Sequence, residues 1–188
     1  LTEAGLSLST WDILMSGLPL AFFALAGVGW FIRRDGRGML ARLGLRWPTV
    51  RQLALAVGIT LLLLALDAGV NLAWEKLDPT GYAQLERVTE SLFGNLMTVG
   101  GAIVLGLSAG ISEELLFRGA LQPRLGLLLA SILFAVGHVQ YGITVATLEV
   151  FVIGLVLGLV RNRTNTTICI LIHAGYNSVG VLLGLLKP

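Results

Sequence analysis

Two acidic residues and an arginine lie inside a long apolar stretch of this sequence. Glu113 and Glu114 are adjacent, Arg118 follows four residues after Glu114, and the flanking segments 96–110 and 120–137 are almost entirely apolar. A charged side chain at the centre of a membrane helix costs roughly 2.5–3.5 kcal/mol on insertion scales. Carboxylates kept at this cost indicate a functional site, because intramembrane acids are typical of catalytic and proton-relay sites.

The two histidines of the chain also lie in apolar stretches. His173 and Asn177 are four residues apart, so one face of a helix presents an imidazole and a carboxamide together. Phe134 precedes His138 by the same step and is expected to pack beside it. Two intramembrane histidines near an acidic pair favour a functional role over simple packing.

A predicted turn at residues 123–126, which contains Pro123 and Gly126, makes the helices on either side antiparallel neighbours. Glu113 and His138 are equally far from this turn, about 19 Å at 1.5 Å per residue. His173 lies about 15 Å from the following basic loop on the same count. We therefore expect all three side chains to converge at one depth within an apolar layer of about 30 Å.

These groups suit hydrolysis of an amide without a covalent intermediate. A carboxylate in an apolar pocket can act as general base on water, with His138 holding the water or moving its proton. His173 and Asn177 can stabilise the oxyanion that develops. Glu114 and Arg118 are expected to pair with each other, which lowers the cost of burying both.

The same donors allow a second interpretation, a Zn²⁺ ion held by Glu113, His138 and His173 with a water in the open position. We favour a site that needs no cofactor, because the three donors come from three helices. The sequence also contains no His-x-x-x-His pair.

The composition predicts an all-α polytopic membrane protein that forms a single domain over residues 1–188. Of the 188 residues, 55% are hydrophobic and 13% charged, and the mean hydropathy is +0.85. Soluble domains carry roughly 25% charged residues. The net charge of +2 comes from loop arginines, so we expect lipid and not nucleic acid as a partner. The single cysteine, Cys169, is expected to be a small buried apolar residue.

Hydrophobic segments predict about six membrane spans, with the active site inside the bundle. They cover residues 11–32, 53–74, 92–122, 127–141, 143–160 and 166–186, and residues 75–91 are expected to form a short interfacial helix. The first segment is interpreted as a true span and not a signal peptide. Arginines gather in alternate loops, so these loops are predicted to be cytoplasmic and both termini outside.

Some polar and small residues are expected to lie outside the site. Asp67 with Asn71 is expected to form a polar pair at the outer boundary, and Glu149 to reach outward to that boundary. Two small-residue motifs are expected to mark tight helix packing, namely Gly106-x-x-x-Gly110 and Gly154-x-x-x-Gly158. Thr49 is expected to be the N-cap of the second span.

Three motifs in this order resemble the intramembrane proteases of the CAAX-processing and bacteriocin-processing family, which includes CAAX prenyl endopeptidases and bacterial "abortive infection" proteins. The motifs are Glu113-Glu114-x-x-x-Arg118, Phe134-x-x-x-His138 and His173-x-x-x-Asn177, and the resemblance covers about residues 95–185. It implies that these residues form the catalytic core of an all-helical endopeptidase that cleaves a membrane-associated protein or peptide, including CAAX-type C-terminal processing. It implies Glu113 as base assisted by His138, His173 and Asn177 as the oxyanion-stabilising pair, and supporting roles for Glu114 and Arg118. The compact chain resembles the bacterial and archaeal members, which predicts a prokaryotic cell membrane.

Two other functions remain open from the residues alone. One is a non-catalytic immunity or scaffold protein that keeps the site as a peptide-binding pocket. The other is a proton-coupled transporter, because midplane acids and histidines also mark proton relays. Against a transporter, six spans are few and no inverted repeat is visible between the two halves of the chain.

Overall fold

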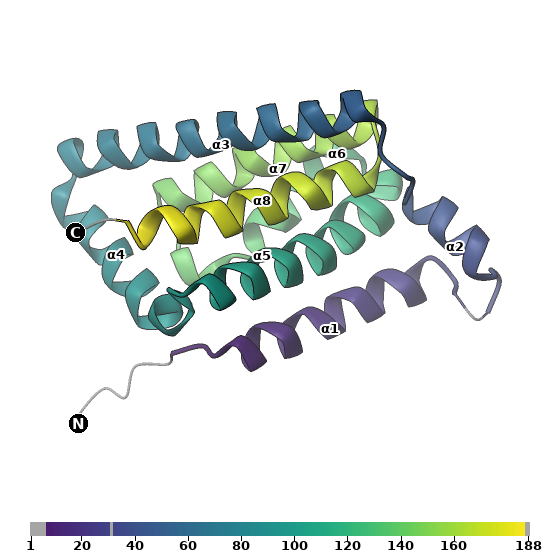
Figure 1. Ribbon diagram of the computed structural model, residues 1–188, viewed down its shortest axis with the longest axis horizontal. Coiled ribbons are helices and arrows are strands. Elements are labelled where there is room, and N and C mark those ends of the chain that lie inside the picture. The colour runs from purple at the N-terminus through teal and green to yellow at the C-terminus, as the bar shows by residue number, and fades with distance from the viewer. Residues whose placement is uncertain (1–6, 31, 187–188) are drawn as a thin grey trace.

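The computed structural model describes residues 7–30 and 32–186, and within them the chain is a bundle of helices without a β-strand (Figure 1). The long helices α3, α5 and α8 lie side by side along the bundle, with α1 on one side and α6 and α7 behind. The helices are α1 (Thr10–Gly27), α2 (Gly36–Leu43), α3 (Val50–Leu77), α4 (Pro79–Phe93), α5 (Val99–Glu114), α6 (Gln122–Val136), α7 (Val145–Arg163) and α8 (Thr166–Gly184). This confirms the all-α prediction.

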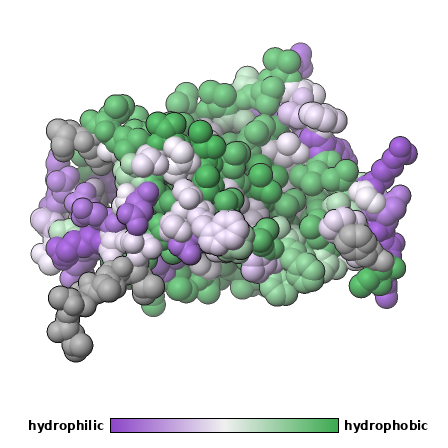
Figure 2. All heavy atoms as spheres, turned by 60° about the horizontal axis from the view of Figure 1, so that its bottom comes forward, coloured by the Kyte–Doolittle hydropathy of each residue, from purple (hydrophilic) through white to green (hydrophobic). Residues whose placement is uncertain are grey.

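Five helical stretches of the described residues are long and apolar enough to cross a membrane. They are Thr10–Gly27, Val50–Leu77, Val99–Val136, Val145–Arg163 and Thr166–Gly184. Hydrophobic residues fill the middle of the visible face, whereas hydrophilic residues gather toward its two ends (Figure 2). The chain is therefore an integral membrane protein.

The predicted third and fourth spans form one of these five stretches, so the expected count of six is corrected. The chain reverses at Gly126, whose backbone has φ 81° and ψ 173°. The helix that follows ends at Val136, about 15 Å later at 1.5 Å per residue, which is too short to cross a layer of about 30 Å. His138 lies beyond this end, because its own backbone leaves the helical region with φ −103° and ψ 44°, and Gly142 follows with φ 63°.

The arginine-rich segment that was predicted to be a loop contains the short helix α2. Asp35 caps its first turn by accepting a hydrogen bond from the Gly38 N–H, and Gly44 ends it with φ 71°. Thr49 and Gln52 form a capping box at the start of α3, which confirms the Thr49 prediction. The predicted interfacial helix corresponds to α4.

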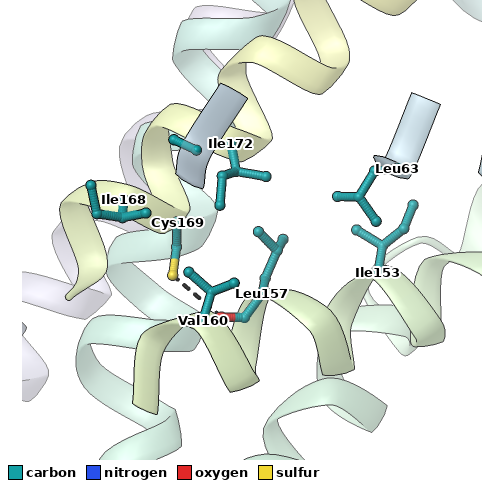
Figure 3. Packing of buried hydrophobic residues seen from close by; sticks show 8 residues of the cluster. Leu63, Ile153, Leu157, Val160, Ile168, Cys169 and Ile172 are labelled. Atoms are coloured by element: carbon teal, nitrogen blue, oxygen red, sulfur yellow. Dashed lines mark hydrogen bonds between the residues drawn. The ribbon is translucent and has the colours of Figure 1, made fainter. Parts of the chain in front are cut away.

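Small residues bring the helices that carry the site into close contact. A Cβ added at Gly110 of α5 would lie 2.9 Å from Ala174 of α8, and one added at Gly154 of α7 would lie 3.3 Å from Ser131 of α6. The close packing predicted for both glycine motifs is confirmed. The apolar contact between α3, α7 and α8 includes Cys169, which is fully buried as predicted and whose thiol lies 3.3 Å from the Leu157 carbonyl oxygen (Figure 3).

Candidate active site

The adjacent acids of the first motif lie at the C-terminal end of α5 and have different surroundings. The segment that follows, Leu115–Leu121, is a π-helix, a widened turn that is frequent at functional sites. Glu114 is fully buried, whereas the side chain of Glu113 is 18% exposed. One acid therefore faces the interior of the bundle and the other faces accessible space.

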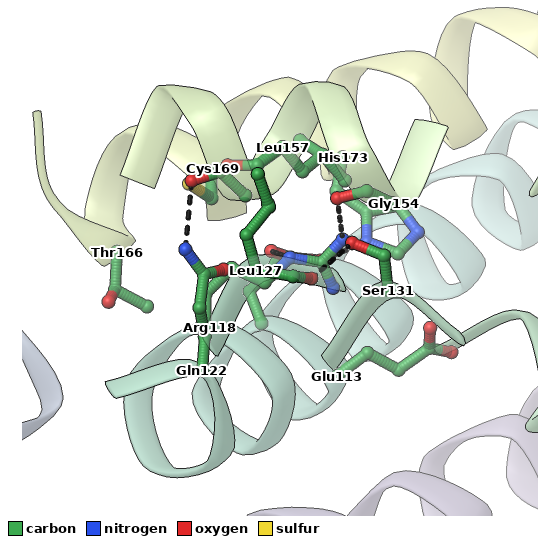
Figure 4. A network of polar contacts seen from close by, with 12 residues as sticks. Glu113, Arg118, Gln122, Leu127, Ser131, Gly154, Leu157, Thr166, Cys169 and His173 are labelled. Carbon is green, nitrogen blue, oxygen red and sulfur yellow. Dashed lines mark hydrogen bonds and ion pairs between the residues drawn. The ribbon is translucent and has the colours of Figure 1, made fainter. Parts of the chain in front are cut away.

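Glu114 is the centre of a buried ionic network. Its Oε2 lies 3.3 Å from Nε of Arg118, and its Oε1 lies 2.9 Å from Nδ1 of His173. Arg118, 1% exposed, also donates to the Gly154 carbonyl oxygen at 3.2 Å and places its guanidinium 4.3 Å from the ring centre of Phe134 (Figure 4). The predicted pair of Glu114 with Arg118 is thus confirmed, and it provides the compensation that buried charges need.

His173 contacts Glu114, where a contact with Glu113 was expected. A carboxylate can only accept, so Nδ1 of His173 donates to it and the ring orientation is fixed by that bond. The number of residues between His173 and the basic loop predicted its depth in the bundle correctly. It could not tell which of two adjacent acids, about 100° apart around a helix, faces α8.

Glu113 and His138 form a second pair, as predicted from their equal distance to the turn. Nε2 of His138 lies 3.8 Å from Oε2 of Glu113, and both side chains are about one-fifth exposed. Nδ1 of His138 lies 2.9 Å from the Phe134 carbonyl oxygen, which can only accept. Nδ1 therefore carries a proton, and in the neutral ring Nε2 is an acceptor that faces the carboxylate. A water beside both groups can donate to each of them, which is the arrangement that water activation requires.

Glu113, His138 and His173 line one cavity of about 1070 Å³, and Glu114 lies buried behind His173. Its lining includes all four predicted catalytic residues, Glu113, His138, His173 and Asn177, together with Phe134. The ring of Phe134 lies between the histidines, with centroid distances of 4.9 Å to His138 and 5.8 Å to His173. A substrate bond placed in the cavity can therefore reach the base on one side and the α8 donors on the other.

Two acids that were expected at the outer boundary line the same cavity, and this corrects both expectations. Asp67 of α3 accepts a hydrogen bond of 3.3 Å from the Tyr176 hydroxyl, and Glu149 of α7 lies near them. Depth along a helix does not reveal which face points inward. Tyr176, between His173 and Asn177 in the third motif, was given no role from the sequence, although its position beside two site residues was a usable signal.

The donors considered for Zn²⁺ are not arranged as one ligand set. Across residues 7–30 and 32–186, no three His, Cys, Asp or Glu side chains are grouped closely enough to hold a metal ion. Glu113 and His138 belong to one pair, whereas His173 is bound to Glu114, whose other oxygen contacts Arg118.

Comparison with known proteins finds relatives of the segment that carries these residues. Residues 95–179 match the family described as type II CAAX prenyl endopeptidase, Rce1-like. A curated relative, the "Uncharacterized protein YpbD" of Bacillus subtilis (strain 168), is 30% identical over 122 residues, which cover 65% of this chain and 61% of the relative. The chain thus matches about three-fifths of that relative's length, and no solved structure matches it. The matched segment runs from just before α5 into α8 and contains both residue pairs and Asn177, and over residues 95–179 the chain is similar to the Rce1-like family of type II CAAX prenyl endopeptidases.

Proposed function

We propose that this protein is an intramembrane endopeptidase in which Glu113 and His138 activate the attacking water. The observation that carries the proposal is the 3.8 Å pair of carboxylate and imidazole beside a large cavity, within a segment that matches a protease family. The similarity of residues 95–179 to the Rce1-like family supports a CAAX-type protease at the general level. The residue roles below are our proposal.

The reaction begins with Glu113 taking a proton from the water held between it and His138. The hydroxide attacks the carbonyl carbon of the scissile amide, and the carbonyl oxygen becomes an oxyanion. A donor on His173 and the carboxamide of Asn177 stabilise this charge. The C–N bond then breaks as the proton moves from Glu113, directly or through His138, to the leaving nitrogen, which gives a carboxylic acid and an amine.

Glu114 and Arg118 position His173 and do not touch the substrate. The Nδ1 contact at 2.9 Å fixes the ring and leaves Nε2 for the oxyanion. A charged imidazole ring can donate from both nitrogens, so Nε2 can donate to the oxyanion while Nδ1 donates to Glu114. The single carboxylate of Glu114 then faces two positive groups, Arg118 and His173, and the net positive charge of the network favours the developing oxyanion.

The proposed substrate is a membrane-associated protein or peptide, with CAAX-type C-terminal processing as one form. The cavity lies within a bundle whose outer surface is apolar, so a substrate segment must enter from or near the lipid. An apolar or prenylated tail partitions into this environment, because each buried CH₂ contributes about 0.8 kcal/mol.

The proposal is tested with purified protein in proteoliposomes and a farnesylated CAAX-type peptide. Glu113→Gln should lower the cleavage rate by about 10²–10⁴-fold, the usual contribution of a general base. Glu75→Gln is the matched control, because it makes the same change at an exposed position at the end of α3. Full activity of the Glu113 variant would refute proteolysis by this site and favour a binding role. A strong chelator should leave the wild-type rate unchanged, and loss of activity that Zn²⁺ restores would refute a metal-free mechanism.

A further inference from the structure

A second hollow lies at the arginine-rich end of the bundle, apart from the catalytic cavity. It has a volume of about 390 Å³ and is lined by the last residues of α1 together with Ile32, Arg33, Arg34 and Arg124. Arg33 and Arg34 follow α1 directly in the chain, whereas Arg124 comes from the first turn of α6. Three guanidinium groups from two distant segments thus line one small volume.

Two of these guanidinium groups are held in place by carbonyl oxygens at the end of α1. Nη1 of Arg34 donates to the Val28 oxygen, and Nη2 of Arg124 donates to the Gly27 oxygen at 2.9 Å. A guanidinium carries five N–H donors, so each group is oriented by one bond and keeps further donors for a ligand. Arg33 makes no hydrogen bond or ion pair through its side chain to the described part of the chain.

The cluster also lacks a balancing acid. The ion pairs formed by residues 7–30 and 32–186 include none of these arginines. Asp35, the nearest acid in sequence, uses its side chain to cap α2. Burial lowers the pKa of the neighbouring Arg42, and the positive charges of Arg124 and Arg34 lower it further. An anion in the hollow would relieve this repulsion and accept the unused donors.

The surroundings of the hollow identify the kind of anion. Ile32 is 81% exposed beside the arginines, and Phe22 and Phe23 are exposed on α1, with Phe23 one turn before Gly27. Because α1 is a candidate membrane span, these apolar side chains continue from the hollow along the surface that faces lipid acyl chains. A free inorganic anion would contact only the arginines. A phospholipid would contact the arginines with its phosphate and the neighbouring apolar surface of α1 with its acyl chain.

We propose that this hollow binds the phosphate of an anionic phospholipid, with the guanidinium groups of Arg33 and Arg124 on the phosphate and an acyl chain against Phe22 and Phe23. Bidentate guanidinium–phosphate contacts supply the specificity for the headgroup. The bound lipid lies in the leaflet that faces the arginine-rich loops. This site is independent of the proposed proteolysis, because none of its residues lines the catalytic cavity.

The test is native mass spectrometry of the full chain in detergent, with phosphatidylglycerol and phosphatidylcholine of identical acyl chains. Phosphatidylglycerol should bind more tightly. Arg33→Gln should weaken its binding about fivefold, as expected for one arginine at an anionic lipid surface. Arg37→Gln is the matched control, because it removes the same charge from an exposed position of α2 outside the hollow and should leave binding unchanged.

Equal weakening by both variants would overturn the proposal in favour of diffuse attraction to the basic end. Displacement of the lipid by millimolar inorganic phosphate would overturn the lipid assignment in favour of a soluble anion. Arg33→Gln removes no bond of the fold, so its melting temperature should match that of the wild type. Arg124→Gln provides a second variant, whose loss of lipid affinity should equal or exceed that of Arg33→Gln because it also frees the Gly27 oxygen.

Discussion

At the scale of single residues, the two adjacent acids have different proposed roles, one in the reaction and one in positioning His173. Glu113 is partly exposed and faces His138, whereas Glu114 is buried between Arg118 and His173. A general base must be accessible to water and substrate, as Glu113 is. A carboxylate that pairs with a buried guanidinium can itself be fully buried, as Glu114 is. The difference in burial fits the proposed roles, in which Glu113 activates water and Glu114 positions His173.

Glu114→Ala should destabilise the protein by about 3–5 kcal/mol, because it leaves the Arg118 guanidinium buried without its carboxylate. Thermal unfolding in detergent measures the effect. Glu113→Gln is the control, since Glu113 is partly exposed and a neutral amide can take its place with little change in stability. A Glu114→Ala variant as stable as the wild type would show that the buried network contributes nothing net.

At the scale of elements, the reversal at Gly126 sets the geometry of the Glu113–His138 pair. A left-handed backbone at this point turns the chain, so that residues on either side of the turn return to the same depth. The π-helix between Glu114 and the turn changes the rotation of the helix at the position of Arg118. Turn and π-helix together decide which side chains meet.

Gly126→Ala should cost about 1–3 kcal/mol, because φ 81° with ψ 173° lies in a backbone region that residues with a Cβ seldom adopt. No atom lies within 4 Å of the added Cβ, so the backbone alone accounts for this cost. Gly58→Ala is the matched control: its added Cβ also meets open space, but it lies inside α3, where alanine is favoured. Equal unfolding temperatures of the two variants would contradict the strained-turn explanation.

Much of this element-level arrangement could be predicted from the sequence, and the missing parts share one physical cause. Pro123 and Gly126 predicted the turn, and residue counts from it predicted that Glu113 meets His138. Residue counts along a helix give the depth of a side chain but not the direction in which it points around the helix axis. The sequence therefore could not predict that His173 binds Glu114 or that Asp67 faces the cavity. A π-helix in particular adds a rotation that no hydrophobic pattern shows.

At the scale of the whole molecule, the arginine-rich end gives the bundle a direction. The N-terminal end of α3, helix α2 and the loop between α7 and α8 lie at this end, and α4 lies at the other (Figure 1). Positive loops remain on the cytoplasmic side during insertion. The predicted orientation therefore places α2 inside the cell and α4 outside.

Cysteine labelling of intact cells tests this orientation in a Cys169→Ala background. A membrane-impermeant maleimide should label Lys76→Cys, at the end of α3 near α4, without permeabilisation. Gly36→Cys, at the start of α2 where an added Cβ meets open space, should be labelled only after permeabilisation. The reverse pattern would contradict the predicted orientation.

The Gly126 reversal also has a consequence for the order in which the active site is built. Glu113 and His138 belong to one local hairpin of the chain, whereas His173 and Asn177 lie on α8, which follows α7. During synthesis the pair proposed to activate water is therefore made before α8, which carries the residues proposed to stabilise the oxyanion, has left the ribosome. Contacts between residues that are near each other in sequence form first, and the contacts with α8 form last. If the proposed mechanism holds, we therefore expect no activity until α8 is in place.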